Sequence, residues 1–320
     1  MRIGIAGGGA FGTALAVALA LDGNDVLLWA RDARAVDRMN AKRANDRLPG
    51  VTLPEGVTAS ADLAALFACD TILLSIPAQT LPDFLTANAQ HLGGKSLVAC
   101  CKGIDLTRMT GPARTIRDLV PSAIAAILTG PSFAADIARG LPTALTLACG
   151  DDATGAVLQR ALSTATLRLY RTTDTVGAEL GGALKNVMAI AAGVAIGAQL
   201  GESARAALIT RGFPEMQRLA MALGGQADTL AGLSGFGDLV LTCTSPQSRN
   251  YRFGVALGEG KAFDPTSTVE GAATARAVRK LAQDRGIDMP IATVVADLAD
   301  GKTDVTEALA TLLSRPLKEE

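Results

Sequence analysis

The chain has 320 residues, of which 49% are hydrophobic and 19% are charged, and its formal net charge at pH 7 is -1. This length is enough for about two domains with sizeable cores. The near-neutral charge argues against nucleic acid and against an acidic membrane surface as partners, because both are bound through a strongly basic face.

The cysteines and the single histidine, His91, exclude further kinds of site. The cysteines show neither metal-ligand nor disulfide-framework spacing, and one histidine cannot supply the usual zinc partners. We therefore expect a reducing, cytoplasmic location and no metal site. The cysteines are Cys69, Cys100, Cys101, Cys149 and Cys243.

The first predicted strand, residues 2–6, runs directly into a glycine-rich loop, and a helical Ala/Leu-rich segment follows from Thr13. In a dinucleotide-binding loop Gly7 allows the tight turn, Gly9 lets the backbone approach a pyrophosphate, and Gly12 lets the helix pack on the strand. The pyrophosphate lies at the helix N-terminus, where free N–H groups point at it. The strand before and the helix after distinguish this loop from a chance glycine turn, so the sequence predicts a dinucleotide site.

The same run imitates a signal peptide, because Arg2 precedes it and residues 18–20 resemble a cleavage site. Its glycines would weaken the apolar helix of a signal peptide, but a phosphate loop requires them. We favour the loop, since cleavage would remove the first strand and the glycines together.

A second strand is predicted over residues 26–29, ending about 20 residues after the loop, where the residue that contacts the adenosine ribose is expected. An acidic residue there would favour NAD. Arg31 instead can pair with a 2′-phosphate and stack on adenine, which favours NADPH over NADH. The neighbouring Asp32 leaves NAD open, and the alternative is an exposed arginine at a strand end.

Further strands alternate with helical segments. Alternation of this kind predicts an α/β fold with a Rossmann-type, doubly wound, mainly parallel sheet, in which ligands bind outside the carboxyl ends of the strands. Lys102 and residues 130–134 follow two of these strands, so we expect this lysine to be functional rather than a solvated loop charge. The further strands are predicted over residues 71–77, 97–100, 124–128, 143–148 and 167–170.

From Asp174 onward helical periodicity replaces the strand-type runs. We expect a dinucleotide-binding domain over residues 1–173 and an all-helical domain over residues 174–320, with Thr173 or Asp174 as the first helix cap. Lys185 and Asn186 interrupt an apolar helix, and burying an ammonium group without a function is costly. The alternative is a lysine that snorkels from the helix edge to solvent.

The apolar stretch at residues 187–200 is shorter than the roughly 20 residues that a membrane-spanning helix needs. It contains the pattern Gly193-x-x-x-Gly197, which is typical of close helix packing. We therefore expect a buried helix in a core or in a dimer interface, which makes a homodimer the predicted assembly.

Two later motifs carry polar groups. Residues 232–239 form a glycine-rich turn that presents Asp238. Ser245 as cap and Pro246 as the first helical residue predict a helix start. Residues 248–250 (Ser-Arg-Asn) would lie in its first turn, where N–H groups and a guanidinium bind phosphate, unless this is an ordinary capped helix.

These parts suggest hydride transfer on a small phosphorylated substrate. Reduction of a carbonyl places negative charge on its oxygen, so the site must supply a proton or a cation there. With no histidine except His91, Lys185 is the candidate general acid and base, and Lys102 would lower its pKa. Asp238 would orient either ammonium group.

The chain resembles the bacterial NAD(P)-dependent glycerol-3-phosphate dehydrogenase family over residues 2–315. The resemblance implies reversible reduction of dihydroxyacetone phosphate to sn-glycerol 3-phosphate for phospholipid synthesis, with NADPH or NADH as cofactor and Lys185 as proton donor and acceptor. The likeness is carried by residues 7–13, 28–31, 102–104, 130–134, 180–187, 236–239, 247–250 and 269–271.

The motifs and the resemblance together predict two sets of binding residues. Ala10 stands where some relatives carry a hydroxyl or an amide, and Cys101 before Lys102 is unusual. The substrate is expected to bind Lys102, Gly130, Ser132, Lys185, Asn186, Asp238, Ser248, Arg249 and Asn250. The cofactor is expected to bind Gly7, Gly9, Ala10, Phe11, Gly12, Trp29, Arg31, Pro77, Lys102, Ala134, Arg249 and Glu270.

Two alternatives remain open. A β-hydroxyacid dehydrogenase also joins a dinucleotide domain to a helical one. In sequences that resemble that family, however, the motif around the lysine is Lys-x-x-x-Asn, whereas here Asn186 follows Lys185 directly. A non-catalytic dinucleotide sensor would need the glycine loop but not Lys185, Asp238 or Arg249. In every case we expect no nucleic acid partner and no membrane insertion.

Overall fold

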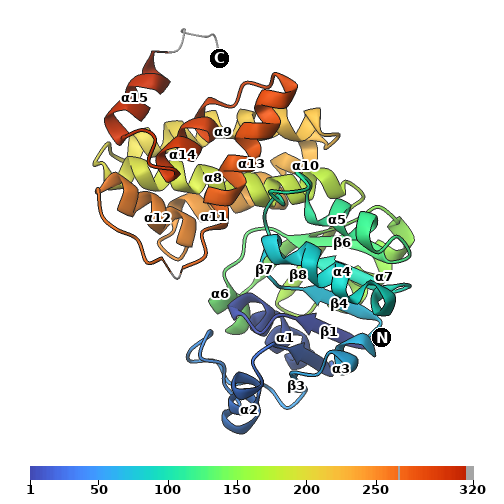
Figure 1. Ribbon diagram of the computed structural model, residues 1–320. Coiled ribbons are helices and arrows are strands. Elements are labelled where there is room, and N and C mark those ends of the chain that lie inside the picture. Colours follow the sequence, from blue (N-terminus) through green and yellow to red (C-terminus); the bar gives the residue numbers. More distant parts are fainter. Residues whose placement is uncertain (266, 315–320) are drawn as a thin grey trace.

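The computed structural model describes residues 1–265 and 267–314. Within these residues every strand precedes helix α8 (Thr175–Gly197), and the chain from α8 onward is helical. The helical half gathers above the sheet in Figure 1. An α/β half followed by a helical half is the predicted arrangement.

Eight strands form one sheet in the order β3-β2-β1-β4-β5-β6-β7-β8. All neighbouring pairs are parallel except β6 and β7. The predicted mainly parallel sheet is confirmed, with one antiparallel step that periodicity did not show. The strands are β1 (Ile3–Ala6), β2 (Val26–Trp29), β3 (Val57–Ser60), β4 (Thr71–Leu74), β5 (Ser96–Ala99), β6 (Ile124–Thr129), β7 (Thr143–Cys149) and β8 (Leu167–Thr172).

Helices cover both faces of this sheet, which explains why strands β1 and β4 at its centre are buried throughout. Packed on one face are α1 (Ala10–Leu21), α2 (Ala33–Lys42), α6 (Ala134–Ala138) and α7 (Asp152–Leu162). On the other face are α3 (Leu63–Phe67), α4 (Leu81–Leu92), which follows the short helix η1 (Ala78–Thr80), and α5 (Pro112–Leu119).

The strand register brings the predicted ligand segments to one edge. Ala6 is paired with Trp29 and with Leu74, Leu74 with Ala99, and Ala99 with Ile127. The five strands therefore end at nearly the same level, and the loops that follow them leave the sheet side by side.

Helix α8 is the centre of the helical half. The Asp174 carboxylate caps it by accepting from the Gly177 N–H at 2.7 Å, as predicted. Around α8 lie α9 (Glu202–Ala222), α10 (Ala227–Ala231), the π-helical turn η2 (Leu233–Gly237), α11 (Asp238–Thr244), α12 (Arg249–Gly258), α13 (Glu270–Arg285), α14 (Pro290–Ala299) and α15 (Val305–Leu313).

The apolar stretch is longer than residues 187–200, because the helix already begins after the Asp174 cap. By length and hydropathy α8 could cross a membrane, so the prediction that it is too short was wrong. However, 89% of its apolar window is buried inside the fold. Its burial in a core, the other part of the prediction, is confirmed.

The glycines of α8 pack against α12 of the same chain. A Cβ on Gly193 would stand 2.1 Å from the Tyr251 carbonyl oxygen, and one on Gly254 2.1 Å from the Ile190 carbonyl oxygen. Close helix packing is therefore confirmed, but within one chain. The pattern at Gly193 and Gly197 gives no ground for a dimer interface.

Replacing Gly193 with alanine is expected to lower the free energy of unfolding by about 3 kcal/mol, because the added methyl group forces two backbones apart. Gly155 in α7 is the matched control, since its Cβ would meet nothing closer than 3.4 Å. Gly155→Ala is expected to be neutral or stabilising by up to about 1 kcal/mol. Urea unfolding of both variants checks this, and equal effects would contradict it.

Candidate active site

The glycine loop between β1 and α1 has the predicted geometry. Gly7 has a φ of +124° and donates its N–H to the Trp29 carbonyl at 2.9 Å, and a Cβ there would stand 2.4 Å from the Ser75 carbonyl oxygen. A Cβ on Gly12 would stand 2.2 Å from the Gly7 carbonyl oxygen. Gly9, by contrast, faces open space, and α1 begins after it without a side-chain cap. The loop thus leaves the helix N-terminus accessible to a pyrophosphate.

Asn45 supports this loop and was not predicted. Its buried side-chain amide donates to the Gly8 carbonyl at 3.1 Å and to the Thr13 hydroxyl at 2.7 Å. Asn45 follows α2, far from the loop in sequence, so no local pattern could have indicated it.

The other predicted cofactor residues lie along the same edge. Arg31 is exposed two residues after the end of β2 and makes no ion pair within the described residues. Pro77 precedes η1, and Ala134 is the first residue of α6. Trp29 requires a correction: it is 7% exposed, and its indole donates to the Ala61 carbonyl at 3.1 Å. Its ring belongs to the core, and its backbone carbonyl accepts from the Gly7 N–H of the glycine loop.

The two predicted lysines meet on Asp238, which is fully buried. One carboxylate oxygen lies 2.6 Å from Lys185 Nζ and the other 2.6 Å from Lys102 Nζ. Lys102 also donates to the Gly130 carbonyl at 3.1 Å. Lys185 is only 6% exposed, so the snorkelling alternative is wrong. Two ammonium groups on one carboxylate leave a net positive charge, which suits a site where an oxygen becomes negative.

Two glycines on α8 make this meeting possible. A Cβ on Gly181 would stand 2.5 Å from the Ser234 carbonyl oxygen, and one on Gly182 2.6 Å from the Thr129 hydroxyl. Gly181 therefore admits η2, which leads into Asp238, and Gly182 admits the end of β6. The glycines that precede Lys185 in the sequence serve close packing from two sides.

Burial lowers the pKa of Lys185 to about 8. The Asp238 carboxylate opposes this change, and the Lys102 ammonium adds to it. The predicted direction is confirmed, but burial is a larger cause than the predicted neighbour, Lys102. A lysine with this pKa can both donate and accept a proton near neutral pH.

Thr242 completes the cluster and was not among the predicted site residues. Lys185 Nζ donates to its hydroxyl at 2.6 Å, and the hydroxyl lies 3.2 Å from the Asp238 carboxylate. The spacing between Asp238 and Thr242 could have indicated it, because residues four apart lie one turn apart on the same face of α11.

The predicted phosphate-binding helix starts later than expected. Ser245 is the C-cap of α11. The N-cap of α12 is Ser248, whose hydroxyl accepts from the Tyr251 N–H at 3.2 Å. The prediction of Ser245 as cap and Pro246 as first helical residue was wrong, because α11 extends to Thr244 and leaves only a turn between the two helices. Arg249 is the first residue of α12, and it is exposed.

The remaining predicted residues are placed around this cluster. Asn250 accepts from the Gly271 N–H at 3.0 Å and so ties α12 to α13. The Ser132 hydroxyl donates to the Gly130 carbonyl at 3.3 Å. Asn186 is buried beside Lys185 and makes no side-chain hydrogen bond within the described part of the chain.

Glu270, at the start of α13, connects the helical half to the sheet half. The backbone N–H of Ala78, one residue after Pro77, is near enough to lower the pKa of this carboxyl group. Burial raises the pKa of Glu270, and the nearby charges of Arg249, Lys102 and Lys185 oppose the rise. The predicted cofactor and substrate residues of the two halves thus share one electrostatic environment.

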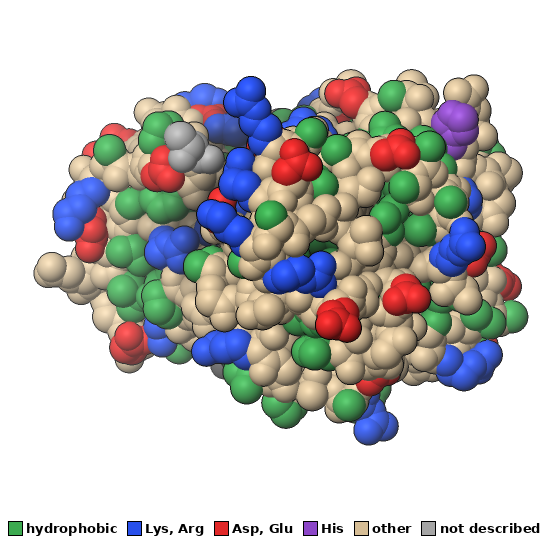
Figure 2. Space-filling view, turned by 90° about the horizontal axis from the view of Figure 1, so that it is seen from below, with side chains coloured by type: hydrophobic (Ala, Val, Ile, Leu, Met, Phe, Trp, Pro, Cys, Tyr) green, Lys and Arg blue, Asp and Glu red, His purple; other side chains and the backbone are tan. Residues whose placement is uncertain are grey.

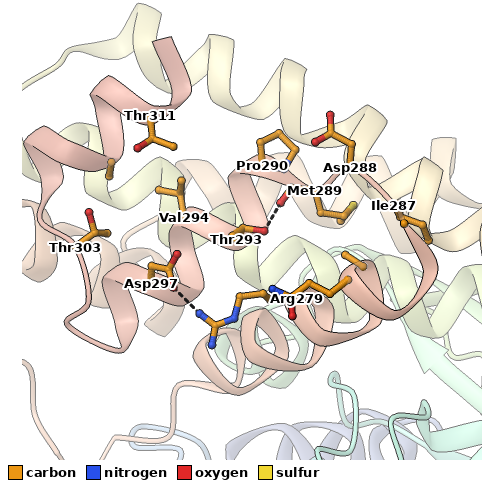
Figure 3. Close-up of a pocket in the computed structure, with 14 residues that line it drawn as sticks. Arg279, Ile287, Asp288, Met289, Pro290, Thr293, Val294, Asp297, Thr303 and Thr311 are labelled. Carbon is orange, nitrogen blue, oxygen red and sulfur yellow. Dashed lines mark hydrogen bonds and ion pairs between the residues drawn. The ribbon is translucent and has the colours of Figure 1, made fainter. Parts of the chain in front are cut away.

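Figure 2 shows Lys and Arg side chains gathered beside a hollow near the middle of one face. A separate pocket of about 400 Å³ lies among α13, α14 and α15, at the end of α13 opposite Glu270 (Figure 3). Arg279 lines that pocket, but its guanidinium is paired with Asp297 at 2.5 Å. No predicted site residue lines the pocket, so it is not the candidate active site.

The sheet, the glycine loop and the two lysines that meet on Asp238 define a class of protein, the dinucleotide-dependent oxidoreductases with a Rossmann-type half and a helical half. Family models described as the N-terminus and C-terminus of NAD-dependent glycerol-3-phosphate dehydrogenase match residues 2–155 and 174–310. The chain therefore belongs to this family. The membership replaces the β-hydroxyacid dehydrogenase alternative.

Individual relatives agree with the family models. The chain is 62% identical to glycerol-3-phosphate dehydrogenase [NAD(P)+] of Cereibacter sphaeroides, over 99% of this chain and 100% of the relative. It is 59% identical to the protein of the same name from Ruegeria sp., over the full length of both. The crystal structure of glycerol-3-phosphate dehydrogenase from Coxiella burnetii matches with a TM-score of 0.92 and 37% identity, over 98% of this chain and 99% of that one.

Proposed function

We propose that this protein is an NAD(P)-dependent glycerol-3-phosphate dehydrogenase, which interconverts dihydroxyacetone phosphate and sn-glycerol 3-phosphate. The observation that carries the proposal is the cluster of the buried Lys185 and Asp238 with the partly buried Lys102, at the sheet edge from which the glycine loop also departs. Full-length relatives bear the name of this enzyme.

The residues present fit a dinucleotide. The open space at Gly9 and the uncapped start of α1 form a cradle that a longer side chain would fill. When bound, the dinucleotide supplies a hydride for reduction and accepts one for oxidation. It would be held by Gly7, Gly9, Ala10, Phe11, Gly12, Arg31, Pro77, Lys102, Ala134, Arg249 and Glu270.

Lys185 carries the proton in this proposal. During reduction its Nζ donates a proton to the carbonyl oxygen of the substrate as negative charge develops there, and in the reverse direction Nζ takes the proton back. Lys102 adds a second cation near the same oxygen, which stabilises the charge. Asp238 and Thr242 hold the Lys185 ammonium in place.

The start of α12 would hold the substrate phosphate. Arg249 offers a guanidinium there, beside Ser248 and Asn250, at the positive end of the helix. Binding the phosphate away from the reacting carbon aligns the substrate. The free energy of phosphate binding thereby lowers the activation free energy of the hydride transfer. Gly130, Ser132 and Asn186 are the further proposed substrate contacts.

One assay tests this function against the sensor alternative. Protein, dihydroxyacetone phosphate and NADPH or NADH are mixed, and the absorbance of the reduced nicotinamide is followed. We expect rapid oxidation of the cofactor that depends on dihydroxyacetone phosphate. A protein that binds NADPH but shows no turnover with this substrate would be a sensor or an enzyme of another substrate.

Arg31 is expected to favour NADPH. Replacing Arg31 with serine removes a cation from the position that faces a 2′-phosphate, so kcat/KM for NADPH should fall by about 10- to 100-fold while that for NADH changes little. Steady-state kinetics with both cofactors check this. Arg34, another exposed arginine, at the start of α2, serves as the control. An equal loss with NADH would contradict the assignment.

The two reaction directions are expected to respond oppositely to pH. Reduction needs the charged form of Lys185, whose pKa is about 8, so its rate should fall about tenfold per pH unit above this value. Oxidation needs the neutral form, so its rate should fall as the pH drops below about 8. Initial rates at saturating substrate between about pH 7 and 10 check both limbs. Parallel profiles would exclude Lys185 as the titrating group.

We further propose the domain boundary between residues 173 and 174, supported by the end of β8 at Thr172 and the Asp174 cap. A cytoplasmic location and a role in phospholipid synthesis remain proposals, the first supported by five cysteines that form no disulfide in the structure. The homodimer stays a prediction, although Gly193 and Gly197, on which it was based, pack within one chain. Sedimentation equilibrium would test it.

A further inference from the structure

The segment that carries Lys102 has no regular secondary structure, yet it is closed into a tight turn. Between β5 and α5, the Asp105 N–H donates to the Thr110 carbonyl at 3.0 Å, and the Met109 N–H donates to the Asp105 carbonyl at 2.9 Å. Only two residues separate Lys102 from this closed turn. Whatever holds the turn in place therefore helps to fix the backbone at Lys102, whose ammonium group then reaches Asp238 and the Gly130 carbonyl.

Glu179 on α8 holds the far side of this turn. It is 8% exposed, and its carboxylate accepts from the Ala113 N–H at 2.8 Å, at the start of α5. A Cβ on Gly111 would stand 2.2 Å from the carboxyl carbon of Glu179, so a glycine is needed for the carboxylate to come this close. Because α8 also carries Lys185, this contact links the helix of Lys185 to the end of the loop that carries Lys102.

Burial disfavours the charged form of Glu179, and groups around it partly oppose this effect. The N-terminus of a helix attracts negative charge, and Arg117 on α5 adds a nearby cation. Asp174 at the start of α8 opposes the ionised form, as does burial, which raises the pKa of Glu179 to about 7. The Cys101 thiol, next to Lys102 in the chain, lies within the field of the same carboxylate.

We propose that Glu179 is a positioning residue for catalysis: by holding the N-terminus of α5 against α8, it sets the position of Lys102 relative to Lys185. This inference rests on the proposed function, since it assumes that both ammonium groups face one substrate oxygen. A loosened turn would leave Lys185 and Asp238 in place and displace Lys102 alone.

The chain offers a matched control in Glu215 on α9. This side chain is also buried and also accepts from the start of a helix, with the Ile291 N–H at 2.9 Å and the Ala292 N–H at 3.3 Å. Burial likewise raises its pKa to about 7. It lies at α14, which carries none of the proposed site residues. Glu179 and Glu215 therefore share side-chain type, burial and the kind of hydrogen bond they accept, and they differ in the helix that they hold.

The experiment compares alanine and glutamine variants at both positions. We expect Glu179→Ala and Glu215→Ala to lower the melting temperature alike, but only Glu179→Ala to lower kcat, by about tenfold, because small displacements of a catalytic group are costly. Glu179→Gln should recover most of the rate, since its amide oxygen can still accept from the Ala113 N–H. An unchanged kcat in Glu179→Ala, or the same loss in Glu215→Ala, would overturn the proposal.

A second readout needs no turnover. Acetylation of the free enzyme with acetic anhydride, followed by mass spectrometry, should label Lys102 faster in Glu179→Ala than in wild type or in Glu215→Ala. Gly111→Ala, whose methyl group displaces the carboxylate, should give the same result and replaces Glu179→Ala if that variant does not fold. Equal labelling of Lys102 in all variants would overturn the proposal. Failure of the proposed function would instead show as absence of turnover in wild type.

Discussion

Lys185→Ala is expected to lower kcat for reduction of dihydroxyacetone phosphate by about 10²- to 10⁴-fold, the range found for loss of a general acid. The variant keeps the cofactor loop and keeps Asp238 paired with Lys102, so binding of NADPH should persist. What is lost is the only proton donor that the proposal places at the carbonyl oxygen. Stopped-flow measurement of nicotinamide absorbance, with NADPH binding followed by fluorescence, separates chemistry from binding.

The control for this variant is Lys280→Ala. Lys280 is an exposed lysine on α13 that pairs with Asp284 at 3.0 Å, and its removal should leave kcat unchanged. A Lys185→Ala variant that turns over as fast as wild type would refute the role given to this lysine. A variant that loses NADPH binding as strongly as turnover would show that the lysine acts on the fold or the cofactor instead.

Asp238→Asn is expected to impair both stability and catalysis. It leaves two ammonium groups in a buried site without a negative charge, which should cost about 3 kcal/mol in free energy of unfolding. Without the carboxylate the pKa of Lys185 should fall further, because Asp238 is the group that opposes the effect of burial. Reduction, which needs the charged lysine, should therefore lose more rate than oxidation does. Urea unfolding and initial rates in both directions measure these effects.

Asp300→Asn provides the comparison for this prediction. Asp300 also contacts several cations, Arg276, Arg279 and Lys302, but its side chain is partly exposed and these cations reach solvent. Solvent screens such pairs, so we expect a loss of less than about 1 kcal/mol and no change in rate. Equal losses of stability in the two variants would show that burial of Asp238 does not matter as argued.

Several features were predictable because they depend on neighbours in sequence. The turn at Gly7, the strand pattern of residues 26–29 and the cap at Asp174 each follow from local conformation or periodicity. Local information failed where two local solutions compete. Ser245-Pro246 is a good helix start, but the preceding helix continues to Thr244, so the cap moves to Ser248.

The sequence by itself determined the class of fold, the dinucleotide loop and the candidate lysines, because glycine spacing, apolar periodicity and an isolated buried charge are written along the chain. Only the tertiary structure decided which groups meet. Asp238 reaches Lys102 across 136 residues, and Glu179 reaches the start of α5 across 66. The glycines at Gly193 and Gly197 fit a dimer interface as well as an internal contact by sequence, and only the packing of α12 on α8 distinguishes the two. Such contacts depend on how whole elements pack, which no local pattern records.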